Sequence, residues 1–176
     1  MIEQESKKAG NQIESLTVGR VRELLDYDPA TGIFTRKICR GGPSPVGSVA
    51  GSQNKVGYIV VRVDMHLIKG HRLAWFVSNG AWPIAEIDHI NGVKFDNRIA
   101  NLREATRTEN VRNVGFRKAN TSGFKGCRLK GGKWEARISI GKGKLKWLGY
   151  FETPEQASEA YKQAAIKYHG EFVRAA

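Results

Sequence analysis

Apolar and polar residues alternate along three short segments in the last third of the chain, at residues 124–129, 134–140 and 144–148. An apolar period of two is typical of strands with one buried face, and the glycine pairs between these segments supply turns. The alternation places Cys127, Leu129, Trp134, Ala136, Ile138 and Ile140 on a buried face, and Arg128, Lys130, Glu135, Arg137 and Ser139 on the opposite one. This region is therefore predicted to form a three-stranded antiparallel sheet with a basic outer face.

The period then changes from two to that of a helix. Alanine and tyrosine recur at helical spacing at Ala157, Ala160, Tyr161, Ala164, Ala165 and Tyr168. Thr153-Pro154-Glu155-Gln156 is a helix start, with an N-cap, a proline at the first position and a glutamine at the third. Gly170 provides a stop. We expect this apolar stripe to pack on the buried face of the sheet.

The first two thirds of the chain mix shorter elements. The pattern predicts a helix over 18–25 capped by Thr17, a strand over 33–37, a hairpin of 58–63 with 65–68, and a helix over 71–76. The expected fold class is α+β. The expected organisation is a disordered tail over 1–16, a first domain over 17–115, a linker over 116–122 and a second domain over 123–176.

Charge narrows the class of partner. The 176 residues carry a net charge of +12, and the 34 residues from 116 to 149 hold ten Lys and Arg against one Glu. Such a localised excess favours a polyanion such as nucleic acid. No apolar run reaches membrane-spanning length and no secretory leader is visible, so we expect a cytoplasmic protein without a membrane partner. Cys39 and Cys127 match neither a zinc site nor a disulfide framework.

The polar segment 87–113, IDHINGVKFDNRIANLREATRTENVRN, holds the candidate chemistry. Asp88-His89 follows a short apolar strand, and Asn91-Gly92 is a turn signal. Thr106-x-x-Glu109 is a capping box that starts a helix near Arg107 and places Asn110 in its first turn. A carboxylate and an amide oxygen suit a hard cation, and His89 suits proton abstraction from water near neutral pH. Taken alone, an Asp-His pair before Asn-Gly is also typical of a plain hairpin turn.

With Asp88, His89, Asn101 and Asn110 at these spacings, the segment resembles the HNH (ββα-metal) endonucleases of the phage and intron-encoded homing type. The resemblance implies that His89 is the general base, that Asp88 and Asn110 bind a divalent ion, Mg²⁺ or alternatively Mn²⁺, and that Asn101 orients His89. It includes the HRLAW segment at 71–75. His71 is either a second active-site histidine or a structural one. Arg98 and Arg103 are either phosphate contacts or solvated surface charges.

The second domain resembles the Apetala-two / ethylene-response-factor DNA-binding domain, through GCR at 126–128, WEARI at 134–138 and WLGYF at 147–151. That family inserts its sheet into the major groove. The resemblance implies that the contacts to duplex DNA are made by Lys125, Arg128, Lys130, Arg137, Ser139 and Trp147. A core role is the alternative for Trp147. Ser139 and Leu145 stand where that family has arginines.

The two resemblances together imply a metal-dependent DNA endonuclease that needs no small-molecule cofactor. A catalytically inactive DNA-binding regulator is the alternative, and an RNA-binding protein is permitted by charge. A monomer is expected to nick DNA, whereas a homodimer would cut both strands. The resemblance also implies a phage-encoded protein that acts inside a host cell.

Overall fold

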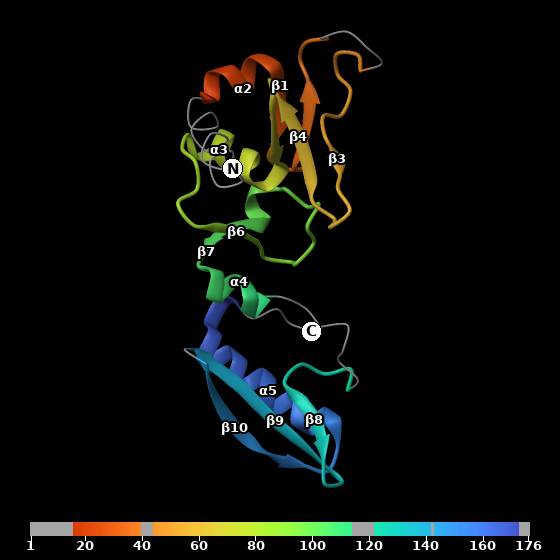
Figure 1. The fold of residues 1–176 in the computed structure, drawn as a ribbon, viewed down its shortest axis with the longest axis vertical. Helices are drawn as coiled ribbons and strands as arrows, with labels where there is room; N and C mark the ends of the chain where they lie inside the picture. Colours follow the sequence, from red (N-terminus) through yellow and green to blue (C-terminus); the bar gives the residue numbers. More distant parts are fainter. Residues whose placement is uncertain (1–15, 40–43, 114–121, 142, 173–176) are drawn as a thin grey trace, which may run out of the picture. The chain divides into compact units, whose positions relative to one another are not determined.

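The computed structural model describes residues 16–39, 44–113, 122–141 and 143–172 (Figure 1). The chain divides into two compact units, Met1–His89 with Val93–Glu104, and Ile90–Gly92 with Ala105–Ala176. The predicted tail and linker lie outside the described residues, except for Leu16, which is buried in the first core, and Ser122. The units meet in sequence at Glu104 and Ala105, whereas we predicted a domain end at residue 115. The predicted domain bounds stay a prediction.

The first unit begins with a helix and five short strands. These are α2 (Val18–Leu24), β1 (Leu25–Asp28), β2 (Ile33–Arg36), β3 (Ser52–Gln53), β4 (Ile59–Val63) and β5 (His66–Lys69). The hydroxyl of Thr17 accepts from the backbone N–H of Arg20, which confirms the predicted helix cap. β1 and β2 form an antiparallel hairpin, and β3, β4 and β5 form a second antiparallel sheet in that order.

One apolar core holds the first unit together. Helix α3 (Gly70–Asn79) contributes Leu73 and Phe76 to it, and Trp75 packs partly buried against it, in agreement with the predicted inward face. Phe34 and Val61 are almost fully enclosed. The rings of Phe76 and Trp82 stack with centroids 4.1 Å apart. Burial of side chains of this size stabilises a domain by roughly 1.5–3 kcal/mol each before entropy is counted.

The predicted candidate segment folds as strand, loop, strand and helix. β6 (Glu86–His89) pairs with β7 (Leu102–Ala105), and α4 (Arg107–Asn113) follows. Glu109 accepts from the backbone N–H and the hydroxyl of Thr106, at 2.8 and 2.7 Å, so the predicted capping box is confirmed. Residues Ile99–Asn101 form a 3₁₀ turn, η1, because the chain must reverse there to pair β7 with β6.

The second unit contains the predicted sheet and helix. β8 (Cys127–Lys130), β9 (Lys133–Gly141) and β10 (Lys144–Phe151) are antiparallel in the order β10-β9-β8, and α5 (Pro154–His169) lies across one face (Figure 1). A 3₁₀ turn, η2 (Gly170–Phe172), follows. Thr153 and Gln156 form the predicted capping box, and Pro154 occupies the first turn. The pairing of β9 with β10 shifts register between Trp147 and Gly149.

The two faces of this sheet differ as predicted, with two corrections. Ala136 and Ile138 are buried against the alanine stripe of α5, and Trp134 packs into the same core. Leu129, predicted to be inward, is 60% exposed, because it lies beside the Gly131 turn and joins neither apolar cluster of the described residues. Ile140 lies near the other end of β9 and is 41% exposed. It too joins neither apolar cluster of the described residues. The mixture of helices and antiparallel sheets confirms the α+β class.

Membrane-spanning helices were not expected from the hydropathy of the chain. Within the described ranges, every helix is too short or too polar to cross a bilayer. This finding concerns helices only.

Candidate functional site

His89, the last residue of β6, lies in a buried cluster of aromatic and imidazole rings. Its side chain is only 5% exposed. The ring of His71, from α3, stands edge-on to it with centroids 5.0 Å apart, and the ring of Tyr58 lies 6.0 Å away. The Nε2 of His89 lies 3.4 Å from the Oδ1 of Asn97. The described fold therefore brings together four side chains, of which our reading of the sequence singled out His89 and His71.

Both imidazoles are neutral near pH 7. Burial lowers the pKa of His89, although the Asn97 bond and the Asp88 carboxylate partly oppose this. Burial, reinforced by His89, Lys69 and Arg72, lowers the pKa of His71 to about 3. A neutral imidazole has a lone pair that accepts a proton, which is the state that a general base requires. The cluster can therefore do base chemistry at physiological pH without first losing a proton.

Asn97 connects this cluster to the β1–β2 hairpin. Its side chain is 2% exposed, and its backbone carbonyl accepts from the hydroxyl of Tyr27 at 2.8 Å. The pKa of Tyr27 is raised to about 12, first by burial, so its hydroxyl stays a donor. The N–H of Ile99 donates to the carbonyl of Pro29 at 3.3 Å. The hairpin thus braces the loop that presents Asn97 to His89.

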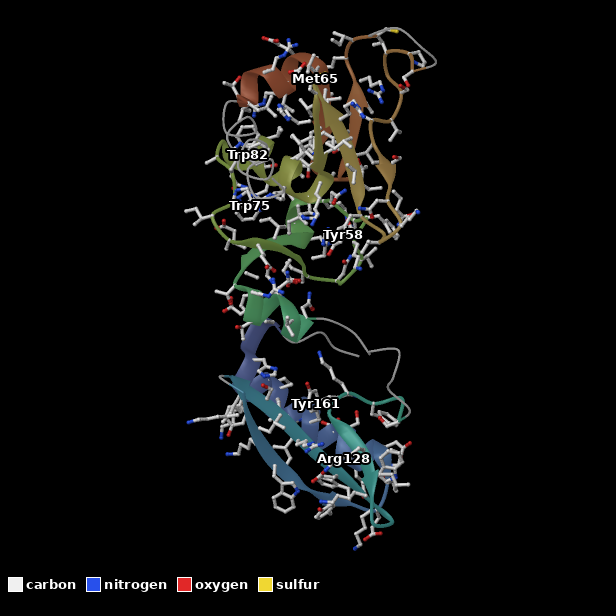
Figure 2. All side chains as sticks on the ribbon, in the orientation of Figure 1. Tyr58, Met65, Trp75, Trp82, Arg128 and Tyr161 are labelled. Carbon is white, nitrogen blue, oxygen red and sulfur yellow. The ribbon has the colours of Figure 1, made fainter. Side chains whose placement is uncertain are left out.

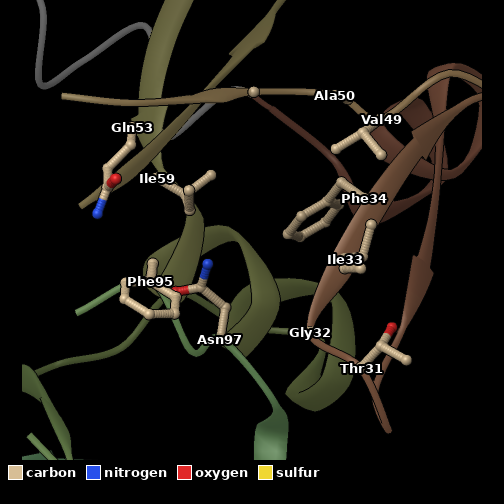
Figure 3. A pocket seen from close by; sticks show the side chains of 11 residues that line it. Thr31, Gly32, Ile33, Phe34, Val49, Ala50, Gln53, Ile59, Phe95 and Asn97 are labelled. Carbon is tan, nitrogen blue, oxygen red and sulfur yellow. The ribbon is translucent and has the colours of Figure 1, made fainter. Parts of the chain in front are cut away.

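A cavity of about 280 Å³ adjoins Asn97 in the first unit. Figure 3 shows Asn97 beside Phe95, with Ile33 and Phe34 of β2 across the opening. The sequence carried a signal for Asn97, because it stands in the polar string DNR at 96–98. However, several asparagines lie close to this string in the sequence, and only the fold shows which of them contacts His89.

Asp88 is buried beside an arginine. It is 4% exposed, and its Oδ2 accepts from Nε and Nη2 of Arg103 at 3.0 and 2.8 Å. The side chain of Arg103 is itself only 14% exposed. Charge-assisted bonds from two nitrogens of one guanidinium fix the carboxylate in one orientation. Arg103 therefore has a structural partner, and its predicted contact with DNA stays a prediction.

Asn101 closes the loop between β6 and β7. It is buried, and its Nδ2 donates to the backbone carbonyl of Asp96 at 2.9 Å. The carboxylate of Asp96 accepts from Nε and Nη2 of Arg98 at 2.8 and 2.6 Å. Arg98 remains half exposed. These bonds fasten the loop on which Asn97 stands, which fits the predicted role of Asn101 as an orienting residue without testing it.

The predicted metal ligands Asp88 and Asn110 belong to different units. Asn110 lies in the first turn of α4, where its N–H donates to the carbonyl of Thr106 at 2.9 Å. Carboxylate and amide oxygens are donors that a hard divalent cation prefers, so this pair fits such an ion chemically. Among the described residues, no group of three or more His, Cys, Asp or Glu side chains is arranged to hold a metal. The pairing of Asp88 with Asn110 on one ion stays a prediction.

On the outer face of the second unit's sheet, the carboxylate of Glu135 interacts with two arginines, Arg128 and Arg137. Glu135 was predicted to face outward, and it does, but it is only 6% exposed. Arg128 donates to its carboxylate, and the Nε of Arg137 lies 3.9 Å from the same oxygen. The hydrogen bond from Arg128 holds the pKa of Glu135 below its usual range. Both guanidiniums are thereby positioned side by side on the exposed face.

Two aromatic residues extend this face. Trp147 pairs in register with Arg137 and is 58% exposed, so its side chain is not part of the core. Its ring meets that of Tyr150 edge-on at 5.7 Å. Tyr150 was missed because the register shift in β10 changes the alternation after Trp147. Of the other predicted contacts, Lys130 and Ser139 are exposed and Lys125 is partly buried.

Comparison with known proteins agrees with both parts of this description. Residues 69–112 match the family model described as HNH endonuclease. This segment is therefore similar to HNH endonucleases. It contains His71, Asp88, His89, Asn97 and Asn110.

The chain is also similar over part of its length to curated plant proteins. The ethylene-responsive transcription factor ERN1 of Lotus japonicus is 42% identical over 60 residues, which are 33% of this chain and 22% of that protein. The ethylene-responsive transcription factor ERF069 of Arabidopsis thaliana is 46% identical over 57 residues, 30% of this chain and 36% of that one. APETALA2-like protein 2 of Oryza sativa subsp. indica is 36% identical over 84 residues, 43% of this chain and 19% of that one.

The chain thus spans between about a fifth and about a third of the length of these curated relatives. No solved structure matches at a comparable level. The similarities are thus of two kinds, to the HNH endonuclease family and to plant proteins such as ethylene-responsive transcription factors.

Proposed function

We propose that this protein is a metal-dependent DNA endonuclease of the HNH homing type that hydrolyses phosphodiester bonds. The observation that supports it most strongly is the buried, neutral His89 directly after the arginine-oriented Asp88, inside the segment that matches an HNH endonuclease. The basic, aromatic sheet of the second unit supports DNA as the substrate. The proposal includes a phage origin of the protein.

In this mechanism, His89 takes the proton from the water that attacks phosphorus. The bond from water oxygen to phosphorus forms, the bond to the 3′ oxygen breaks, and the products carry a 5′-phosphate and a 3′-hydroxyl. The Oδ1 of Asn97 accepts a hydrogen bond from the N–H at Nε2 of His89, and this bond fixes the orientation of the ring. In this tautomer the lone pair lies on the other ring nitrogen, Nδ1. Asn101 supports the loop that carries Asn97.

Asp88 and Asn110 are the residues that would hold the divalent ion, Mg²⁺ or alternatively Mn²⁺. When bound, the ion supplies stabilisation of the negative charge that develops on the phosphate and on the leaving oxygen. Arg103 keeps the Asp88 carboxylate in one orientation, since Nε and Nη2 of its guanidinium both donate to Oδ2 of Asp88. Arg98 and Arg103 are also proposed to contact phosphates beside the cleaved bond.

The second unit is proposed to dock on duplex DNA through its exposed sheet face, with Lys125, Arg128, Lys130, Arg137, Ser139 and Trp147 as contacts. The exposed face of a β-sheet can enter the major groove, where an arginine can donate two bonds to guanine. Glu135 preorganises Arg128 and Arg137, so less side-chain entropy is lost on binding.

Replacing Arg137 with alanine is expected to weaken binding to specific duplex DNA by about 5- to 150-fold, because one bidentate base contact contributes roughly 1–3 kcal/mol. Fluorescence anisotropy with the chelator present measures this without cleavage. Lys162→Ala is the matched control, since Lys162 is an exposed cation on α5 and loses the same charge. Equal DNA affinities of the two variants would show that Arg137 is not part of the interface.

The proposed function is tested by incubating supercoiled plasmid with the full chain and Mg²⁺, Mn²⁺ or a chelator. We expect relaxed or linear plasmid only with a divalent metal. The ratio of the two products separates nicking by a monomer from double-strand cutting by a dimer. DNA binding without cleavage under every metal would instead favour a DNA-binding regulator, the function that the names of the plant relatives carry.

A further inference from the structure

Tyr58 directly precedes β4 (Figure 2). Two lysines lie close to its ring. The Nζ of Lys69 lies 5.1 Å from the ring centroid, and so does the Nζ of Lys94. Lys69 immediately precedes α3, and Lys94 stands on the loop between β6 and β7. Both lysine side chains are exposed, whereas the tyrosine ring is partly buried. Three separate segments therefore bring two ammonium groups to one place.

Neither lysine is simply a solvated surface charge. Lys94 donates from its Nζ to the backbone carbonyl of Val56 at 3.1 Å, and a Cβ on Gly57 would lie 3.7 Å from its Cδ, so its stem follows the 54–57 turn. Lys69 occupies the N-cap of α3, and the first turn of that helix has no acidic residue. The positive end of the helix dipole disfavours a cation at that position. The fold therefore keeps two like charges close together, although one of them stands at the unfavourable end of a helix dipole.

The lysines also lie next to the proposed general base. The ring of Tyr58 is 5.2 Å from that of His71 and 6.0 Å from that of His89. The two Nζ atoms lie within about 10 Å of each other, a span of two or three phosphates on one strand at about 3.4 Å of rise per charge. A DNA strand whose cleaved bond faces His89 would therefore pass within reach of both ammonium groups.

We propose that Lys69 and Lys94, held on the Tyr58 ring, form a binding site for backbone phosphates of the DNA strand that flanks the cleaved bond. The site rests on the proposed endonuclease function. Tyr58 acts as the support that fixes the two stems, so the cations are already in place before DNA arrives. Contacts of this kind position the strand on the first unit, separately from the docking of the second unit's sheet, and they carry no base specificity.

The salt dependence of binding tests the site. Each lysine that neutralises a phosphate releases a counterion and adds about 0.9 to the slope of log K against log salt concentration. We therefore expect Lys69→Gln and Lys94→Gln each to reduce that slope by about 0.9, and each to weaken binding about eightfold at about 0.1 M salt. In the double variant, the slope should fall by about twice as much as in either single variant. Measurements use the full chain, duplex DNA and a chelator, between roughly 0.05 and 0.3 M salt.

Three controls separate this site from a general charge effect. Lys162→Gln removes a cation from α5 and should leave the slope nearly unchanged. Lys94→Arg keeps the charge and should retain the wild-type slope. Unfolding midpoints of all variants should match that of the wild type, because the lysines are exposed.

The two proposals can fail separately. If the wild type cleaves plasmid but both glutamine variants bind and cut as Lys162→Gln does, the phosphate site is wrong and the endonuclease stands. If the wild type never cleaves but the slopes fall as expected, the lysines bind phosphate on a protein that is not a nuclease. Slopes that fall equally in all three glutamine variants would also overturn the site.

Discussion

Replacing His89 with alanine should lower the rate of plasmid cleavage by about 10²- to 10⁴-fold, the usual contribution of a positioned general base. The imidazole of His89 is buried, neutral and held by Asn97. No other described side chain occupies its position next to Asp88. Removing the imidazole leaves Asp88 and the sheet of the second unit unchanged. Affinity for duplex DNA, measured with a chelator, should therefore stay within about twofold of the wild type.

His66→Ala is the matched control for this experiment. His66 lies on β5 in the same unit and is partly exposed, and none of the proposed roles uses it. We expect its variant to cut at the wild-type rate. If His89→Ala also cuts at that rate in Mg²⁺, then His89 is not the base. A rate loss accompanied by an equal loss of DNA affinity would indicate a damaged first unit rather than missing chemistry.

The sequence predicted the secondary structure around this site better than the contacts that support it. Asp88 and His89 follow an apolar strand, and the Thr106–Glu109 capping box marks α4, so strand and helix were predictable from local signals. The contacts of Asn97 with His89 and of Tyr27 with Asn97 join residues 8 and 70 positions apart. Periodicity carries no information about such contacts, because they depend on how the β1–β2 hairpin packs against the loop.

The same limit explains the errors in the second unit. Alternation predicted that the sheet has an apolar and a basic face, but the face of a residue does not by itself determine its burial. Leu129 shares the inward face and is exposed at the end of the sheet, whereas Glu135 shares the outer face and is covered by Arg128 and Arg137. Burial depends on how far α5 reaches and on which long side chains fold over a neighbour. Both are properties of the assembled sheet.

The turn at Gly32 is where the β1–β2 hairpin presses on the loop that carries Asn97. Gly32 has φ +74°, and its N–H donates to the carbonyl of Asp28 at 2.8 Å. A Cβ at this position would lie 2.5 Å from the carbonyl carbon of Asn97, against backbone that has no rotamer with which to move away. Only a glycine permits both this φ and this close approach. The backbone of Asn97 can be held here because nothing projects from residue 32.

Gly32→Ala should therefore destabilise the protein by about 2–5 kcal/mol, which combines about 1–2 kcal/mol for the left-handed conformation with about 1–3 kcal/mol for overpacking. Gly80→Ala is the matched control, because Gly80 has φ +79° and a methyl group added there would meet no atom within 4 Å, so only the conformational cost of about 1–2 kcal/mol applies. Urea unfolding of both variants at pH 7 measures the difference. Cleavage by Gly32→Ala, measured where the variant is still folded, should fall further than its stability alone explains, because displacing Asn97 releases the ring of His89. Equal losses of stability in the two variants would show that the hairpin does not brace this loop.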